Sequence, residues 1–183
     1  MGSNPITPTM NKNIILSLDG VIADIDTSVS EYLHYDCGIS LDYSKWITTN
    51  TKDKEALHLF SKKIFWKNLK PFEDSWYKCN EWFSKNIDIH IISTRKEEIK
   101  QITDSWLDEW NIGYNKIHYC NFGKKLDVIS SINPVFVIEN NPSDFKKIEK
   151  AGFKCYLRKS WYNKTHWKAM DSVDSLYDIR FEQ

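Results

Sequence analysis

The chain has 183 residues, of which 41% are hydrophobic, and its 25 basic residues balance 25 acidic residues. This length suits a single domain or a core domain with a small cap, and the composition excludes a disordered chain. A net charge of zero gives no support for a broad electrostatic surface that binds nucleic acid or membranes.

The cysteines lie far apart in the sequence, and none belongs to a Cys-x-x-Cys pair; they are Cys37, Cys79, Cys120 and Cys155. This spacing argues against a zinc site and against a disulfide framework, so we expect reduced thiols. No apolar run approaches the ~20 residues of a membrane span, and the N-terminus lacks a secretory signal. We therefore expect a cytoplasmic, intracellular protein.

The N-terminal part begins with small polar residues and prolines. We expect residues 1–9 to be a flexible arm or an added extension before a natural start at Met10. Residues 14–18 are a short apolar run between polar residues, which predicts a buried strand. Residues 27–38 are a candidate helix, and residues 41–50 have the composition of a loop.

The middle of the chain alternates amphipathic helices with strands. Pro71 ends the first helical region because proline cannot continue a helix, and Gly113 suits a C-terminal helix cap. Predicted helices span residues 53–65, 75–86 and 97–110, and predicted strands span residues 87–92 and 116–119.

The last part continues the same alternation and contains a strongly apolar strand. Gly152 is expected to close the helix that precedes it. Predicted helices span residues 126–132, 142–150 and 166–177, and predicted strands span residues 134–138 and 153–157.

Strands that alternate with helices predict an α/β fold, a three-layer Rossmann-like parallel sheet with helices on both faces. Ligands of such sheets bind beyond the carboxyl ends of the strands, so the polar residues just after each strand are the candidates. They are Ser17, Asp19, Ser93, Thr94, Glu139, Asn140 and Asn141, with Lys124 and Lys125 before a helix on the same side.

These clusters, in this order, resemble the four motifs of the haloacid dehalogenase (HAD) superfamily of phosphatases, and most closely its 5′(3′)-deoxyribonucleotidase-like branch. The likeness runs from Ile14 to about Asn163. Three further segments are similar to that branch: the cap sequence IFWKNLKP at 64–71, the sequence TDSWL at 103–107 and the sequence WYN at 161–163.

The resemblance implies a domain organisation. A HAD-like core would comprise residues 10–26 and 72–183, and a small helical cap, residues 27–71, would be inserted after the first strand.

The resemblance also implies roles. Phosphoryl transfer in this superfamily proceeds through an aspartyl phosphate, and Asp19 would protonate the leaving oxygen and then activate water. Polar and cationic side chains would hold the phosphate oxygens, and cap aromatics would stack on a nucleobase. The implied phosphate-binding residues are Ser93, Thr94 and Lys125, and the implied base-stacking residues are Phe65 and Trp66.

Two positions depart from the family pattern. Ser17 stands where the family has the attacking aspartate, and Asn140 stands where it has a metal-binding carboxylate. A serine hydroxyl is un-ionised near neutral pH and needs a dedicated base. Losing a catalytic nucleophile commonly lowers the rate by roughly 10⁴–10⁶.

The family cofactor is Mg²⁺, which prefers anionic oxygen ligands. The implied metal positions are Asp19, through its backbone carbonyl, and Asn140, and both Glu139 and Asp144 could hold a cation instead. With two neutral replacements at the site, magnesium binding is possible but doubtful.

Three functions remain open. A non-catalytic relative of the nucleoside-monophosphate phosphatases would keep a pocket for a phosphorylated ligand, such as a nucleotide. An active Mg²⁺-dependent 5′-nucleotidase or phosphomonoesterase would work with a modified site. A protein-binding module would use the fold with an empty pocket. The chain could therefore be a phosphatase or a pseudoenzyme, and the paired departures favour the pseudoenzyme.

Each candidate residue also has a purely structural interpretation. Asp19 could be an ordinary turn residue, and Ser93 and Thr94 could cap the helix that starts near Lys96. Lys125 could be a solvated surface residue. Lys124 competes with Lys125 for the phosphate, and the cap aromatics Phe65 and Trp66 could be core residues.

Overall fold

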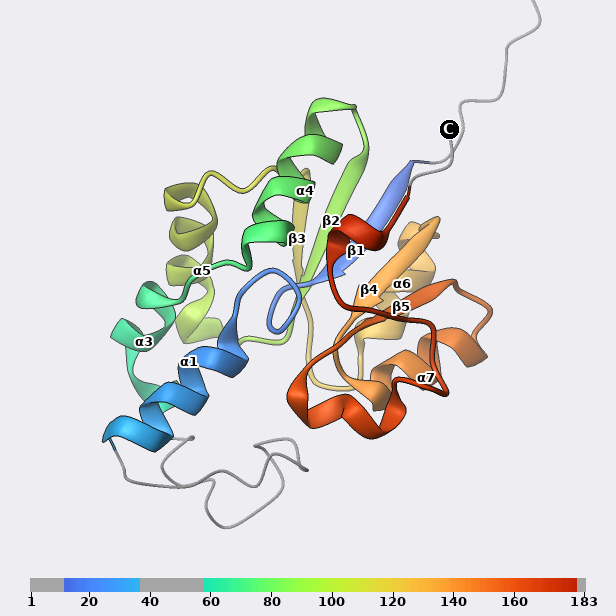
Figure 1. The fold of residues 1–183 in the computed structure, drawn as a ribbon. Helices are drawn as coiled ribbons and strands as arrows, with labels where there is room; N and C mark the ends of the chain where they lie inside the picture. Colours follow the sequence, from blue (N-terminus) through green and yellow to red (C-terminus); the bar gives the residue numbers. More distant parts are fainter. Residues whose placement is uncertain (1–11, 37–57, 181–183) are drawn as a thin grey trace, which may run out of the picture.

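The computed structural model describes residues 12–36 and 58–180, and it contains a parallel six-stranded sheet with helices on both sides (Figure 1). The strand order is β3-β2-β1-β4-β5-β6, and the α/β Rossmann-like prediction is confirmed. The strands are β1 (Asn13–Ser17), β2 (Asp88–Ser93), β3 (Lys116–Tyr119), β4 (Phe136–Glu139), β5 (Cys155–Arg158) and β6 (Ser172–Val173).

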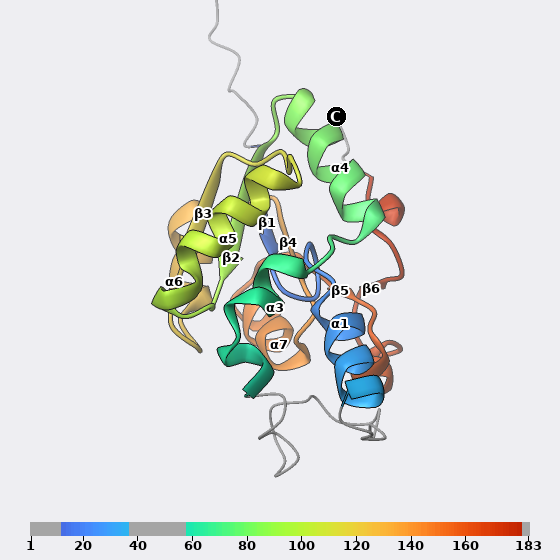
Figure 2. The ribbon, with the colours of Figure 1, turned by 90° about the vertical axis from the view of Figure 1, so that its left-hand side faces the viewer.

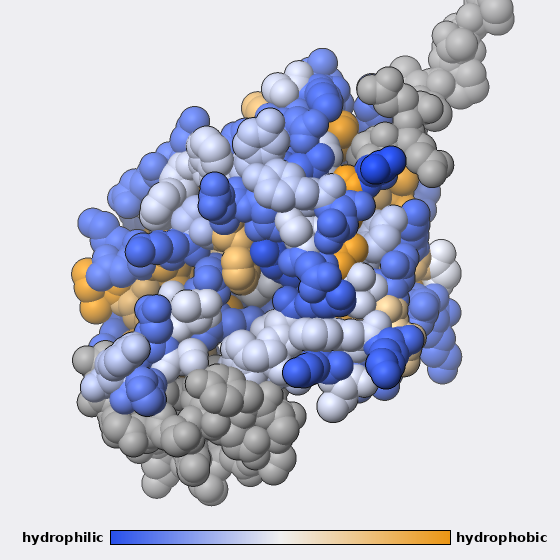
Figure 3. All heavy atoms as spheres, in the orientation of Figure 1, coloured by the Kyte–Doolittle hydropathy of each residue, from blue (hydrophilic) through white to orange (hydrophobic). Residues whose placement is uncertain are grey.

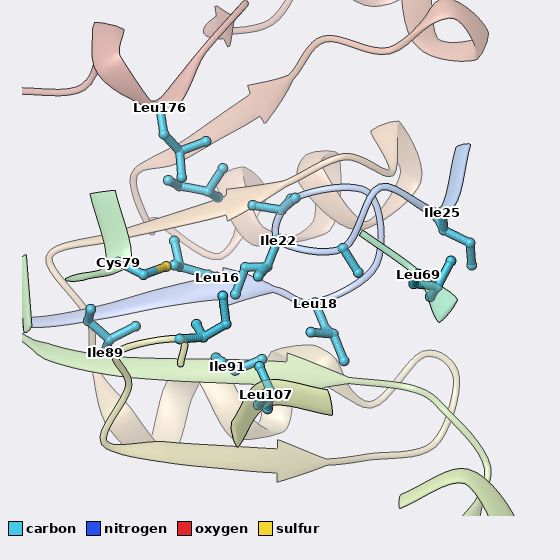
Figure 4. Close-up of a cluster of buried hydrophobic side chains, with 14 of the residues drawn as sticks. Leu16, Leu18, Ile22, Ile25, Leu69, Cys79, Ile89, Ile91, Leu107 and Leu176 are labelled. Atoms are coloured by element: carbon cyan, nitrogen blue, oxygen red, sulfur yellow. The ribbon is translucent and has the colours of Figure 1, made fainter. Parts of the chain in front are cut away.

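Strand β1 lies at the centre because its side chains are apolar on both faces. Leu16 faces one side of the sheet, together with Ile89 and Ile91 of β2, and meets Cys79 and Leu107 from two helices (Figure 4). Ile15 belongs to a second cluster on the opposite side. Burial on both faces is what a parallel strand between crossover helices requires.

The helices form the two outer layers (Figure 2). Apolar residues of α4 and α5, such as Trp82 and Trp106, join the cluster around Leu16. Ile129 of α6 and Phe145 of α7 join the cluster around Ile15. The bounds are α4 Glu73–Ser84, α5 Glu97–Glu109, α6 Lys125–Ile132 and α7 Pro142–Lys150.

Two short helical segments lie at the carboxyl end of the central strands (Figure 1). They are α1 (Ile25–Glu31), which continues into the π-helical segment η1 (Tyr32–Asp36), and α3 (Lys63–Asn68), which packs on α5. Segment α3 falls within residues 27–71, the range expected for the cap, and α1 begins two residues before that range. The predicted loop at 41–50 and the start of the helix predicted from residue 53 lie outside the described residues.

The helix predicted over residues 166–177 is wrong. The chain instead forms the 3₁₀ segment η3 (Trp161–His166), strand β6 and the 3₁₀ segment η4 (Leu176–Asp178). The amide N–H groups of Leu157 and Lys159 donate to the carbonyls of Asp171 and Val173, so strand pairing uses backbone groups that a helix would need. The sixth strand is therefore not among the strands predicted from the sequence.

The expected cap role of Gly113 is also wrong. Helix α5 ends through Asn111, which has a left-handed backbone with φ of 50°, and Asn86 and Asn133 take the same conformation after α4 and α6. Asparagine tolerates that region better than most residues. Gly113 is instead required for packing, because a Cβ atom there would lie 2.8 Å from the Cβ of Phe83.

A buried ion pair fastens the C-terminal segment to α4. Both carboxylate oxygens of Asp74 accept hydrogen bonds from the Arg158 guanidinium, at 2.8 and 3.1 Å. The same carboxylate accepts bonds from the Ser175 hydroxyl and the Leu176 amide, both at 2.7 Å. Burial alone would raise the pKa of Asp74, but these partners hold it below its ordinary value.

The surface in Figure 3 is mostly hydrophilic, with apolar residues in separate small areas. Among the described residues, no helix is long and apolar enough to cross a membrane.

Candidate active site

The carboxyl edge of the sheet brings three predicted positions together. Ser17 ends β1, Ser93 ends the neighbouring strand β2, and Glu139 ends β4 on the other side of β1. All three side chains are buried. Because the strands are parallel and adjacent, residues far apart in the sequence meet at this edge.

Lys125 lies at the centre of this group. Its ammonium nitrogen is 3.2 Å from the Ser17 hydroxyl oxygen, 2.7 Å from a Glu139 oxygen and 3.3 Å from an Asp144 oxygen. Burial alone would lower the pKa of Lys125, but the two carboxylates outweigh burial and raise it above its ordinary value. The residue therefore stays a cation next to Ser17.

Lys124 points elsewhere. Its side chain is 66% exposed and pairs with Asp127 at 3.4 Å, whereas the Lys125 side chain is 12% exposed. Of the two lysines that the sequence left in competition, only Lys125 contacts Ser17 in the described structure.

Both carboxylate oxygens of Glu139 accept hydrogen bonds. One oxygen accepts from Lys125, and the other accepts from the backbone amides of Asn140 at 2.9 Å and Asn141 at 3.1 Å. The Asn141 side chain caps α7 by accepting from the amide of Ser143. Glu139 is thus held as the counter-ion of Lys125.

Asn140 lies against the loop that follows β1. Its backbone carbonyl accepts hydrogen bonds from the Tyr162 hydroxyl at 2.8 Å and the Asn163 amide at 2.9 Å. Its side-chain nitrogen is buried and has no hydrogen-bond partner among the described residues. A Cβ atom on Gly20 would lie 1.6 Å from that nitrogen, and Gly20 has φ of +76°, so the contact requires glycine.

Asp19 is bound by an arginine. Both carboxylate oxygens accept from the guanidinium of Arg95, with a shortest distance of 2.6 Å. The Arg95 side chain is almost fully buried, while that of Asp19 is 24% exposed. Asp19 must leave this contact, or share it, before it can exchange a proton with a ligand.

Arg95 is a site residue that is not among those predicted from the sequence. Its guanidinium also donates to the Thr103 hydroxyl at 3.0 Å and lies over the ring of Trp66 at 4.6 Å. The signal was present, since Arg95 follows Ser93 and Thr94 directly after β2. It joins the β1 loop, α3 and α5 at one point.

Ser93 and Thr94 do not cap a helix. The Ser93 hydroxyl accepts from the amide of Arg95 at 3.2 Å, and Thr94 is half-buried beside it. Lys96 is the N-cap residue of α5, which has no side-chain cap bond. Both hydroxyls thus lie outside the helix start at the carboxyl edge.

The two aromatic residues predicted to stack on a nucleobase are packed inside the described structure. Phe65 and Trp66 are both buried and meet edge to face, with ring centroids 5.2 Å apart. The Trp66 indole donates to the carbonyl of Phe60 at 2.8 Å, and Arg95 covers its ring. Stacking on a nucleobase stays a prediction for both residues, and any such stacking would need one ring to be uncovered.

Several of the positions implied for the metal at this edge offer no anionic oxygen that is free of hydrogen bonds. Ser17 and Asn140 are neutral, and the ammonium of Lys125 is 3.2 Å from the Ser17 oxygen. Both oxygens of Glu139 are engaged. Magnesium prefers hard, anionic oxygen ligands. Among the described residues, no group of three or more histidine, cysteine or acidic side chains is placed to hold a metal ion.

No protein-family model matches the chain. A protein named as a nucleotidase, from Clostridium acetobutylicum, is 23% identical over an alignment of 169 residues, and the match covers 83% of this chain and 82% of that protein.

Solved structures share the fold. A HAD-superfamily hydrolase from Ehrlichia chaffeensis matches with a TM-score of 0.54 and 17% identity, over 92% of this chain and 93% of that one. A HAD family hydrolase from Deinococcus radiodurans, with bound phosphate and sodium, matches with a TM-score of 0.55 and 10% identity, over 79% of each chain. A third, from Lactobacillus delbrueckii, matches with a TM-score of 0.62 and 13% identity, over 92% and 96%.

Proposed function

From the HAD-like fold that the solved structures share with this chain, we propose that the protein is a relative of the nucleoside-monophosphate phosphatases with lost or strongly reduced turnover. It keeps a pocket for a phosphorylated ligand, and a nucleoside monophosphate is the ligand class we favour. The likeness to a protein named as a nucleotidase supports the ligand class.

One observation carries the proposal. The hydroxyl of Ser17 ends the central strand, where a nucleophile would have to lie, and its polar neighbour is the Lys125 ammonium at 3.2 Å. An ammonium with a raised pKa cannot take the hydroxyl proton, and the Glu139 carboxylate behind it is already engaged. Nucleophilic catalysis by serine needs an adjacent base.

The polar groups at the carboxyl edge are suited to bind a phosphate group. Lys125 and the hydroxyls of Ser93 and Thr94 are donors for phosphate oxygens, and Ser17 adds a further hydroxyl without adding a negative charge. Replacing carboxylates by Ser17 and Asn140 lowers the repulsion of an anion. The proposal therefore predicts binding that does not depend on Mg²⁺.

The experiment compares the wild type with a variant that restores both carboxylates, Ser17→Asp and Asn140→Asp. Thermal unfolding would be measured with inorganic phosphate and with nucleoside monophosphates, with and without Mg²⁺. We expect the wild type to be stabilised by phosphate compounds regardless of Mg²⁺, and the restored variant to gain a response to Mg²⁺. An unchanged metal response in both proteins would contradict the motif assignment.

A neighbouring pair of lysines gives a matched control. Lys125→Met should abolish the stabilisation by phosphate, whereas Lys124→Met should retain it because Lys124 is exposed and pairs with Asp127. Each variant is compared with its own melting temperature without ligand, because removing Lys125 also leaves Glu139 without its cation and Asp144 with only the more distant Lys147, at 3.9 Å.

The second candidate is an active phosphatase with an altered site, and the convergence of Asp19, Ser93 and Lys125 on one edge favours it. Steady release of phosphate from nucleoside monophosphates in the presence of Mg²⁺, abolished by Asp19→Asn, would establish it and overturn the first proposal. If no compound of a phosphomonoester panel releases phosphate in the presence of Mg²⁺, Mn²⁺ or Co²⁺, the second candidate is excluded.

A further inference from the structure

A buried carboxyl joins the start of α1 to the segment behind the candidate site. Asp26 lies in the first turn of α1 and is 5% exposed. One of its oxygens accepts a hydrogen bond from the hydroxyl of Ser160 at 2.7 Å, across 134 residues of sequence. No other residue of the described structure bonds to this carboxyl.

The surroundings of Asp26 disfavour a negative charge. Burial is the largest cause and raises its pKa to about 7, although the Ser160 hydroxyl opposes the rise. The carboxylates of Asp24, just before α1, and Asp19, in the β1 loop, raise it further. A carboxyl that takes up its proton below about pH 7, well above the usual range of aspartate, is therefore expected at this position.

Arg158 and Tyr162, which lie near Asp26, form hydrogen bonds with other residues. Arg158 of β5 lowers the pKa of Asp26 only weakly, because its guanidinium is bonded to Asp74. The Tyr162 hydroxyl of η3 donates to the carbonyl of Asn140. Burial and the nearby Asp26 keep the pKa of Tyr162 far above its ordinary value, so that phenol stays neutral.

Ser160 connects Asp26 to the candidate site. It is the N-cap residue of η3, and its amide donates to the side-chain oxygen of Asn163 at 2.9 Å. The side-chain nitrogen of Asn163 donates to the carbonyl of Asn140 at 2.9 Å. A continuous set of hydrogen bonds therefore runs from Asp26 to the residue that lies over Gly20.

We propose that Asp26 is a positioning residue whose buried carboxyl holds Ser160 and η3 in place and thereby fixes Asn140 at the proposed phosphate pocket. When Asp26 loses its proton, a charge is buried beside Asp24 and Asp19. The bond from Ser160 favours the carboxylate, but the lost solvation and the repulsion from the two neighbouring carboxylates outweigh it, so the packing of α1 against η3 is destabilised. The consequence for ligand binding rests on the proposed function, while the coupling between Asp26 and η3 does not.

The first test is the pH dependence of stability in Asp26→Asn, a neutral isostere that still accepts a bond from Ser160. A carboxyl whose pKa is raised in the folded state contributes stability that is lost as pH rises from about 4 to 7. We expect the melting temperature of the variant, relative to wild type, to rise by about 5 °C between pH 5 and pH 8. Asp171→Asn, at an exposed carboxylate, should leave the wild-type profile unchanged.

The second test measures amide hydrogen exchange of peptides that cover residues 138–141 and 158–167. At pH 8 the wild type should exchange about tenfold faster there than Asp26→Asn, because most of its Asp26 is ionised. At pH 6 the two proteins should exchange alike. A structural acid without a positioning role would change the melting temperature but leave this local difference absent.

Parallel melting profiles, or equal exchange at pH 8, would overturn the proposal. So would an Asp26→Asn protein that fails to fold, since the neutral amide reproduces the protonated form. None of these readouts uses a ligand. A lack of phosphate binding would therefore defeat the proposed function alone, and a lack of pH-dependent exchange would defeat the role of Asp26 alone.

Discussion

At the scale of single residues, the candidate site consists of two ion-paired groups that share the carboxyl edge. One is centred on Lys125, which contacts Ser17, Glu139 and Asp144. The other is centred on Arg95, which holds Asp19. Each cation is almost fully enclosed. Removing either the cation or its carboxylates would therefore leave an uncompensated charge, which destabilises the fold.

Removing Arg95 should therefore weaken the fold. Arg95→Met leaves Asp19 and Thr103 without their donor and removes the cation from the Trp66 ring. We expect the free energy of unfolding, measured by urea denaturation, to fall by about 2–4 kcal/mol.

Lys96→Met, at the exposed neighbouring position, is the matched control and should change the free energy of unfolding by less than about 0.5 kcal/mol. Equal effects of the two substitutions would contradict the anchoring role of Arg95.

The sequence located most of these residues but not their partners. The strand ends place Ser17, Ser93 and Glu139 at one edge, because strand position follows from apolar pattern. The contact between Asp19 and Arg95 depends on side-chain directions in three dimensions, which the pattern does not contain. The stacking predicted for Trp66 requires a free ring face, and Arg95 covers one face of that ring.

At the scale of elements, helix ends were harder to predict than helix interiors. Helix α7 begins at Pro142 and ends at Lys150, as predicted, because proline at the first turn and glycine after the end are strong signals. Helix α5 ends through Asn111 instead of Gly113. Asparagine and glycine both adopt the left-handed conformation, and only packing against Phe83 distinguishes the two positions.

Substitutions at Asn111 test this end of α5. The residue is exposed and has φ of 50°, so Asn111→Ala should lower the free energy of unfolding by about 1 kcal/mol through backbone strain. Asn111→Gly should be neutral or stabilising, because glycine adopts this conformation without strain. Chemical denaturation of both variants checks the pair, and a loss of stability with glycine but not with alanine would contradict the assignment.

At the scale of the whole molecule, the alternation of strands and helices was sufficient to predict the parallel sheet but not its sixth strand. Strand β6 has two residues and pairs with β5 at the edge. Two residues are too few to show the alternation of apolar and polar side chains that indicates a strand, and the sequence of residues 166–177 therefore predicts a helix. Its formation depends on long-range pairing, which no local pattern records.

The stability of the whole molecule should also fall in acid because of a histidine pair between β2 and β3. Ring nitrogens of His90 and His118 are 2.9 Å apart. Burial lowers the pKa of both rings, with Lys116 as a further cause. The unfolded chain then binds more protons than the folded chain below about pH 6.5, so the free energy of unfolding decreases as pH falls through that range.

The double variant His90→Gln with His118→Gln should show a flatter dependence between pH 7.5 and pH 5 in calorimetry. His34→Gln, at an exposed position, is the control. Asp26 acts with the opposite sign in part of the same range, so each variant is compared with wild type at the same pH. A wild-type slope retained by the double variant would contradict the role of the pair.

The hydrogen bonds that Ser175 and Leu176 donate to Asp74 also bear on when the protein can fold during translation. Asp74 leaves the ribosome about a hundred residues before its partners, since it is separated from Ser175 by 101 positions. Until then its buried carboxylate lacks two of its donors, and β5 lacks the neighbour that covers its edge. The nascent chain therefore completes its fold only after residue 176 has emerged. Until then its open sheet edge could pair with other chains. A chaperone that shields this edge would act before that point.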